Sequence, residues 1–145
     1  MVSSNSLQIG SAAPDFALET LAGQSIRLSD FRGKPVLLTL GASWCPDCQR
    51  EAHLLQRLHK RRRNLVVLMV DTKEERALVQ AYADEFGLTF PVALDTNGAV
   101  AEIYRVSALP TEFLIDKNGV IQACLIESVT ESSLAALLRT LGLRP

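Results

Sequence analysis

The clearest chemical feature of this chain is a pair of cysteines, Cys45 and Cys48, within the stretch SWCPDC. Cysteines separated by two residues can share a metal ion, form a disulfide or exchange electrons with another thiol pair. The elements that hold the pair decide between these chemistries, because each chemistry needs different neighbours.

The residues on either side of the pair predict a strand followed directly by a helix. The run VLLTLGA, residues 36–42, is continuously apolar, which is typical of a strand buried on both faces. Pro46 suits the first position of a helix, and leucines within residues 54–58 give that helix an apolar stripe. This arrangement places Cys45 at the helix N-cap.

A thiol at a helix N-terminus faces amide hydrogens that have no partner inside the helix, and it meets the positive end of the helix dipole. Both effects favour thiolate over thiol, so Cys45 is the expected nucleophile. Cys48 lies one turn later on the same face, where it can resolve a mixed disulfide formed by Cys45. Such a pair needs no cofactor, because its sulfur atoms carry the electrons.

A structural zinc site is the main competing interpretation of the cysteine pair, and it would need two further ligands. Cys124 is distant in the sequence and falls inside a predicted strand, where a small buried apolar side chain is expected. His53 and His59 are six residues apart on the predicted helix, so they cannot both point where the thiols do. The redox interpretation is therefore favoured.

The remaining pattern predicts an α/β fold with a central mixed sheet, flanking helices and an N-terminal hairpin around Ala22 and Gly23. Asn118-Gly119 predicts a turn between two antiparallel strands. Thr72 and Glu75 form a capping-box pattern that opens a helix ending at Gly87. The other expected elements are a helical turn at 29–31, strands at 65–71, 111–116 and 120–127, a short helix at 98–104 capped by Asn97, and a last helix from Thr130 to about Leu141.

Composition is consistent with one domain over residues 1–145, in which residues 1–9 form a flexible segment. The chain has 145 residues, of which 48% are hydrophobic, and a formal net charge of −1. A balanced charge does not favour a nucleic-acid partner, so the cations at 60–63 are expected to form a solvated helix end. No apolar run approaches a membrane span, and the first ten residues do not resemble an export signal.

Two stretches of the chain resemble a known family. They are APDFALETLAGQSIRLSDFRGKPVLLTLGASWCPDCQRE and FPVALDTNGAVAEIYRVSALPTEFLIDKNGVI. Their order and their most specific pieces, WCxxCxxE and LPTxFLID, are similar to the thioredoxin-like thiol-disulfide oxidoreductases of the TlpA/ResA type, a branch related to AhpC/TSA proteins and peroxiredoxins. The resemblance covers roughly Leu7 to Leu141 and implies a thioredoxin-like fold.

The resemblance implies a role for each matching residue. Cys45 corresponds to an exposed attacking cysteine and Cys48 to a buried resolving one. Trp44 and Pro46 flank the first cysteine and are expected to contact substrate. Leu109 and Pro110 match a loop in which the proline is cis and aligns the substrate chain.

Glu51 matches an acidic residue three positions after the second cysteine, where a partly buried carboxylate can shuttle a proton during disulfide exchange. A solvated helix glutamate is the alternative. Thioredoxins proper have a buried aspartate where Thr39 stands, so Glu51 is the expected substitute. Asp47 is expected to oppose a thiolate at Cys45 and thus to make the reduced protein a stronger electron donor.

Two other functions fit less well. A peroxidase of the peroxiredoxin type needs its cysteine three residues after the threonine, whereas Cys45 follows Thr39 by six. A copper-handling module of related fold needs a later histidine, and none follows His59.

The favoured function is therefore a reductant of protein disulfides. The resemblance implies protein thiol substrates such as an apocytochrome c or another exported protein, and an upstream membrane or soluble thiol reductant. It also implies an extracytoplasmic location, whereas the absence of an export segment leaves a cytoplasmic one open. No metal or nucleic acid is expected, and the protein is expected to be a monomer.

Overall fold

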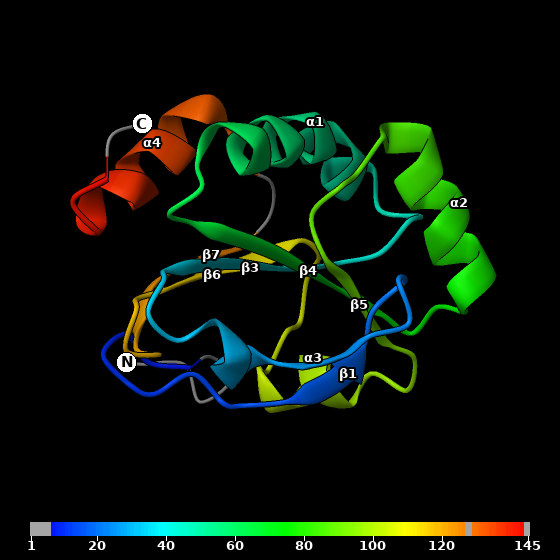
Figure 1. Ribbon diagram of the computed structural model, residues 1–145, viewed down its shortest axis with the longest axis horizontal. Helices are drawn as coiled ribbons and strands as arrows, with labels where there is room; N and C mark the ends of the chain where they lie inside the picture. The colour runs from blue at the N-terminus through cyan, green and yellow to red at the C-terminus, as the bar shows by residue number, and fades with distance from the viewer. Residues whose placement is uncertain (1–6, 127–128, 144–145) are drawn as a thin grey trace.

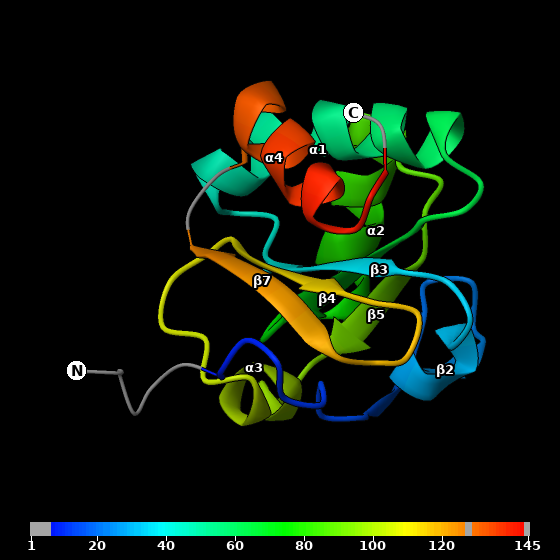
Figure 2. The same cartoon turned by 90° about the vertical axis from the view of Figure 1, so that its left-hand side faces the viewer.

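A five-stranded sheet lies at the centre of the computed structural model, which describes residues 7–126 and 129–143 (Figure 1). Helices cover one face of the sheet, and a short helix with the N-terminal hairpin covers the other (Figures 1 and 2). The strands of the sheet are β3 (Val36–Gly41), β4 (Val66–Thr72), β5 (Val92–Asp95), β6 (Thr111–Ile115) and β7 (Ile121–Ile126). The helices are α1 (Pro46–Arg61), α2 (Arg76–Phe86), α3 (Ala99–Ile103) and α4 (Glu131–Thr140).

Strand β3 occupies the middle of the sheet, whose order is β5-β4-β3-β6-β7. It runs parallel to β4 and antiparallel to β6, so the prediction of a mixed sheet is confirmed. Leu40 near the end of β3 pairs with Thr111 at the start of β6. The segment that follows β3 and the segment that precedes β6 therefore meet at one edge of the sheet.

Two hydrophobic cores, one on each face of the sheet, explain why β3 is apolar except at Thr39. Leu37 packs with residues of α1, α2 and α4, whereas Leu38 packs on the opposite face with Tyr104 and Phe113. Leu37 and Leu38 are both fully buried. A strand covered on both faces leaves no position for a solvated side chain.

Several predicted boundaries are confirmed. Cys45 is the N-cap of α1, Thr130 is the N-cap of α4, and β6 pairs with β7 in an antiparallel hairpin. Gly119 in the turn of that hairpin has a φ of 85°, which a glycine adopts without strain. The N-terminal hairpin consists of β1 (Ala17–Glu19) and β2 (Ser25–Arg27), and the helical turn η1 (Leu28–Phe31) follows it.

The predicted capping box at Thr72 is wrong. Thr72 is the last residue of β4, and its hydroxyl donates a hydrogen bond of 3.0 Å to Asp95. Lys73 has a φ of 61°, and α2 begins only at Arg76 with Glu75 as its N-cap. The paired strand continues beyond the residue at which the local pattern predicts a helix cap, because cross-strand contacts outweigh a local motif.

The cap of α3 also differs from its prediction. Gly98 occupies the N-cap in the left-handed region, although the Asn97 side chain accepts a hydrogen bond of 3.0 Å from the amide of Ala99. Asp95 accepts hydrogen bonds from the amides of Val100 and Ala101 and thereby provides the main cap.

Two expectations reach residues outside the described part. The last residue of the predicted strand, Glu127, lies outside it, and so do residues 1–6 of the segment expected to be flexible. Leu7 is half-buried and packs against the core that contains Leu38. Among the helices of residues 7–126 and 129–143, none combines the length and apolar character of a membrane span.

Replacing Leu38 by alanine tests the role of β3 in the core. Leu38 is fully buried, so Leu38→Ala is expected to lower the free energy of unfolding by about 2–5 kcal/mol, measured by urea denaturation. Leu78→Ala on α2 is the control, because the Leu78 side chain is exposed and its removal should change stability by less than about 0.5 kcal/mol. Equal losses in both variants would contradict the assignment of the core.

Candidate active site

The two cysteines lie where the chain leaves β3 and enters α1. The amide of Cys45 donates to the carbonyl of Ala42, and the amide of Gln49 donates to the carbonyl of Cys45. The amide of Cys48 donates a hydrogen bond of 3.1 Å to the sulfur of Cys45. The first turn of the helix therefore directs an amide hydrogen at the sulfur of Cys45, as the sequence predicts.

Both cysteines are free thiols and both are buried, with exposures of 3% for Cys45 and 4% for Cys48. The expectation that Cys45 is exposed is therefore wrong, because its side chain turns inward to accept the hydrogen bond from Cys48. Its neighbours provide the surface instead. Pro46 is exposed, and Trp44 is 67% exposed.

Three hydrogen bonds hold Ser43 in the loop before the pair. Its amide and hydroxyl donate to the carboxylate of Glu74 over 2.6 and 2.5 Å. Its carbonyl accepts a hydrogen bond of 2.7 Å from the side-chain amide of Gln49. Glu74 comes from the segment between β4 and α2 and is buried, so the loop is anchored to a neighbouring strand. The sequence offers no local sign of this contact, which spans 31 residues.

Gly41 is required by the close approach of Cys48. A Cβ atom on Gly41 would lie 3.1 Å from the sulfur of Cys48 and 3.4 Å from Met69. Any larger residue at the end of β3 would therefore displace the resolving thiol. The sequence does not distinguish this glycine from the apolar residues around it.

Glu51 lies on the inner side of Cys48 and is 2% exposed. Its carboxyl group accepts a hydrogen bond of 2.9 Å from the amide of Val129 and contacts the hydroxyl of Thr39 at 3.3 Å. A cavity of about 10 Å³, close to the volume that one water molecule requires, is bounded by Cys48, Glu51 and Thr39 together with neighbouring apolar residues. The expected position of a carboxyl group beside the resolving cysteine is confirmed.

Glu112 is a second buried acid at this site, and the sequence analysis missed it. It is 1% exposed, pairs with Thr39 across β3 and β6, and contacts the Thr39 hydroxyl with its own carboxyl group. It is also within hydrogen-bonding reach of Glu51. The sequence did contain one signal of a buried acid at the site: Glu112 lies two residues after Pro110, inside a strand, where its side chain can face inward.

Burial changes the acidity of these groups. Desolvation raises the pKa of the Cys48 thiol, and the neighbouring Cys45 and Glu51 raise it further. Burial also raises the pKa of Glu51, although hydrogen bonds from Glu112, Val129 and Thr39 oppose the shift. Cys48 therefore holds its proton, and a carboxyl group with raised proton affinity lies beside it.

Tyr82 reaches the same region from α2. Its hydroxyl donates a hydrogen bond of 3.3 Å to the carbonyl of Cys48. Burial raises the pKa of Tyr82, and the nearby Cys48 and Glu51 raise it further. Tyr82 therefore stays neutral, and it connects the hydrophobic core to helix α1 through this hydrogen bond.

The proline loop lies at the same edge of the sheet. The Leu109–Pro110 peptide bond is cis, as the resemblance implies. Pro110 is buried, Leu109 is half-buried, and the hydroxyl of Thr111 closes the loop with a hydrogen bond of 2.7 Å to the carbonyl of Ala108. Because Thr111 pairs with Leu40, this loop borders the segment that carries the cysteines.

Asp47, between the two cysteines, forms an ion pair with Arg50 one turn along α1. Asp47 is half-buried, whereas the Arg50 side chain is 68% exposed. The positive charge of Arg50 partly offsets the negative charge of Asp47. The expected effect of Asp47 on Cys45 is therefore reduced in size but keeps its sign.

The other candidate ligands lie apart from the pair. Cys124 is half-buried in β7 opposite Phe113, two strands away from β3. His53 packs on Phe86 and His59 packs on Phe90. Within the residues that the structure describes, no cluster of three or more histidine, cysteine, aspartate or glutamate side chains could hold a metal ion.

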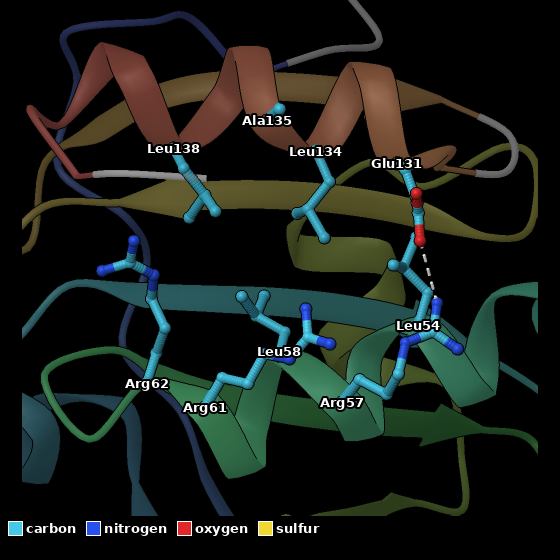
Figure 3. A pocket seen from close by; sticks show the side chains of 9 residues that line it. All are labelled: Leu54, Arg57, Leu58, Arg61, Arg62, Glu131, Leu134, Ala135 and Leu138. Atoms are coloured by element: carbon cyan, nitrogen blue, oxygen red, sulfur yellow. Dashed lines mark hydrogen bonds and ion pairs between the residues drawn. The ribbon is translucent and has the colours of Figure 1, made fainter.

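A surface groove of about 490 Å³ lies between α1 and α4, and Figure 3 shows leucines of both helices facing each other across it. Arg57 and Glu131 form an exposed ion pair of 3.1 Å at one end. The groove includes neither cysteine. It is lined by Leu54, Arg57, Leu58, Arg61, Arg62, Glu131, Leu134, Ala135 and Leu138.

Comparison with known proteins agrees with this geometry. The model of the AhpC/TSA family matches residues 9–124. The chain is 39% identical over 128 residues to thiol-disulfide oxidoreductase ResA of Geobacillus kaustophilus, covering 87% of this chain and 74% of that protein. It is 38% identical over 132 residues to the thioredoxin-like protein YneN of Bacillus subtilis, covering 88% and 77%.

Solved structures share the fold. A protein from Chlorobium tepidum, assigned as thiol:disulfide interchange protein DsbE, superposes with a TM-score of 0.88 at 30% identity. The superposition covers 94% of this chain and 100% of that one. The predicted thioredoxin-like fold is confirmed.

Asp71, near the end of β4, is a further buried acid, and it lies close to Glu74, the residue that binds Ser43. It is fully buried, and neither of its oxygen atoms receives a hydrogen bond from the described residues. Burial, together with Glu74 and Asp95, raises its pKa to about 9. The folded protein therefore binds a proton that the unfolded chain releases at lower pH, and stability falls as pH rises from about 4 to about 9.

Asp71→Asn removes this dependence and keeps a neutral side chain of the same shape. The stability of the variant relative to the parent is expected to be higher at about pH 8 than at about pH 5 by up to about 4 kcal/mol, because the parent loses about 1.36 kcal/mol per pH unit between the two pKa values; urea denaturation at each pH measures it. Glu85→Gln is the control, since Glu85 is exposed on α2. A gain that is the same at both pH values would contradict a raised pKa at Asp71.

Proposed function

The chain belongs to the AhpC/TSA family and is a thiol-disulfide oxidoreductase, and from this premise we propose that it reduces protein disulfides through Cys45 and Cys48. The observation that carries the proposal is the hydrogen bond from the Cys48 amide to the Cys45 sulfur at the start of α1. A thiolate at this position is stabilised by the helix, whereas the buried Cys48 keeps its proton until it is needed.

In the proposed reaction, the Cys45 thiolate attacks one sulfur of a substrate disulfide and forms a mixed disulfide. The other substrate sulfur leaves as a thiolate and takes up a proton. Cys48 then loses its proton and attacks the sulfur of Cys45, which forms the Cys45–Cys48 bond and releases the second substrate sulfur as a thiolate. The substrate gains two electrons, and the cysteine pair loses two.

Glu51 accepts the proton of Cys48 in this scheme. Its carboxyl group borders the same small cavity as Cys48, so a proton can pass directly or through one water molecule. Thr39 contacts Glu51 and Glu112 and is thereby committed to these carboxyl groups. This arrangement supports thiol exchange rather than a peroxidase that uses Thr39 to activate a thiol.

The proposed substrate surface consists of Trp44 and Pro46 on one side and Leu109 and Pro110 on the other. Trp44 and Pro46 are exposed beside Cys45, and the proline loop lies at the same sheet edge. A protein segment with a disulfide fits such a surface, because backbone groups of the loop can align an extended chain. Because Cys45 is buried, the residues of this surface have to move before the Cys45 sulfur can reach a substrate.

Proteins that contain thiols or disulfides are suitable substrates for a chain whose relatives are named thiol-disulfide oxidoreductases. We propose an exported protein such as an apocytochrome c as substrate, and a membrane or soluble thiol reductant as electron source. The proposed setting is extracytoplasmic, and the proposed form is a monomer of one domain. The chemistry requires no cofactor.

The reduction potential of the Cys45/Cys48 pair tests the direction of electron flow. Equilibration in thiol buffers, with Cys124→Ser as background, is expected to give a value at or below that of thioredoxin, about −270 mV. A value near −120 mV, typical of a strong oxidant, would overturn the assignment as a reductant.

Trapping of the mixed disulfide is the matched control. Cys48→Ser should accumulate a covalent complex with a disulfide-containing protein through Cys45, whereas Cys45→Ser should accumulate none under the same conditions. The reverse result would exchange the roles of the two cysteines.

Asp47→Asn tests the effect of charge between the cysteines. Removal of the negative charge favours a thiolate at Cys45 and hence the reduced form, so the potential is expected to rise by about 10–30 mV, a small shift because Arg50 already offsets part of the charge. Glu102→Gln on α3 is the charge-matched control, since Glu102 is exposed on the opposite side of the sheet. An unchanged or lower potential in Asp47→Asn would exclude the proposed effect.

A further inference from the structure

Two buried carboxyl groups meet around one hydroxyl on the inner side of Cys48. Thr39 in β3 contacts Glu112 across the strand pair and Glu51 on α1. All three side chains are at least 97% buried, since their exposures are 3%, 2% and 1% for Thr39, Glu51 and Glu112. The groups come from three separate elements, so the cluster is a product of the fold and not of a local motif.

The hydrogen bonds of this cluster require an additional proton. The Thr39 hydroxyl has one hydrogen, yet its oxygen lies in hydrogen-bond contact with both carboxyl groups. If both carboxyl groups were ionised, only one of these contacts could contain a hydrogen, and two negative charges would face each other away from water. At least one carboxyl group must therefore be a neutral acid.

The distribution of donors shows which carboxyl group is neutral. Glu51 receives the amide hydrogen of Val129 on one oxygen and contacts Thr39 with the other. Glu112 contacts only Thr39 among the donors of the described residues, and its second oxygen, Oε1, receives no hydrogen bond. A buried carboxylate without donors is costly, whereas a neutral acid at the same place can donate its own hydrogen.

We propose that Glu112 is a neutral carboxylic acid that donates a hydrogen bond toward Glu51, directly or through Thr39, and so keeps Glu51 ionised and ready to accept the proton of Cys48. The inference rests on the proposed function, because it concerns the proton step of the same reaction. Glu112 is a positioning residue, since it acts on Cys48 only through Glu51.

The proton balance of the resolving step follows from this assignment. Before the step, Cys48 is a thiol, Glu51 is a carboxylate and Glu112 is an acid. The Cys48 proton moves to Glu51 across the small cavity that both residues border. The resulting thiolate attacks Cys45, and the electron pair of the broken bond leaves with the substrate sulfur. Both acids are then neutral until Glu51 releases its proton.

The other titratable groups around the cluster act in the same direction. Burial raises the pKa of Glu112 well above its ordinary value, and the contact with Glu51 raises it further. Cys45 adds to the shift at Glu112, and Glu112 itself raises the pKa of Cys124 in β7. Glu51 also raises the pKa of Cys48 and of Tyr82, and Asp71 raises the pKa of Tyr82 as well. Within the described part of the chain, none of the groups that cause these pKa shifts is a cation.

Infrared spectroscopy tests the protonation state without reference to activity. The reduced parent protein at neutral pH should show the carbonyl stretch of a protonated carboxylic acid, and the parent minus Glu112→Gln difference spectrum should contain that band. The subtraction cancels the contribution of Asp71, the other acid with strongly raised pKa in the described chain. A difference spectrum without an acid band would overturn the proposal.

Kinetics test the role. The rate at which Cys48 releases a substrate thiol from a mixed disulfide on Cys45 is measured against pH in the parent, Glu112→Gln and Glu112→Met. The glutamine amide donates like the neutral acid, so its profile should match the parent. Methionine donates nothing, so Glu51 should stay protonated to higher pH, and the midpoint of the profile should rise by about one pH unit, a tenfold loss of rate below it.

The outcomes separate the inference from the function on which it rests. A glutamine profile displaced as far as that of methionine would overturn the assignment of Glu112 as a hydrogen-bond donor. If Glu112→Met fails to fold, the infrared difference and the glutamine profile still decide. An acid band in a parent protein that forms no Cys45–Cys48 disulfide would refute the proposed function and support only the protonation state of Glu112.

Discussion

The hydrogen bond from the Cys48 amide to the Cys45 sulfur exists because β3 ends directly beside the first turn of α1. A strand covered on both faces cannot bend within the core, so the chain changes direction only when it reaches the sheet edge. There the helix begins with amides that lack partners, and a sulfur atom takes the place of a conventional cap. Gly41 allows the second thiol to pack against the strand end, and the proline loop reaches the same edge because β6 runs antiparallel to β3.

The site combines this helix terminus with an unusual amount of buried acid. Glu51, Glu112, Asp71 and Glu74 are each 7% exposed or less, and each contacts or pairs with a residue of β3 or of the loop before Cys45. Acids in such positions destabilise a fold unless they are neutral or hydrogen-bonded. Their presence is consistent with proton handling and with loop positioning, two tasks that an apolar core cannot perform.

The sequence was most informative where the controlling interactions are local or periodic. The apolar run of β3, the leucine stripe of α1 and the Asn118-Gly119 turn each predicted an element close to its observed bounds. The sequence was least informative where residues far apart meet. Thr72 has the local pattern of a cap but remains in its strand, and neither the Ser43–Glu74 anchor nor the Glu51–Glu112 contact has a local signature. The inward position of Cys45 likewise depends on side-chain packing that spacing does not encode.

The anchored loop has a consequence for recognition. The amide, hydroxyl and carbonyl of Ser43 are all engaged, whereas the adjacent ring of Trp44 is 67% exposed. The backbone beneath the ring is therefore ordered before any encounter, and the entropy lost on association is confined to a few side chains. A large exposed ring on a fixed backbone offers contact area whose use does not require the loop to become ordered first.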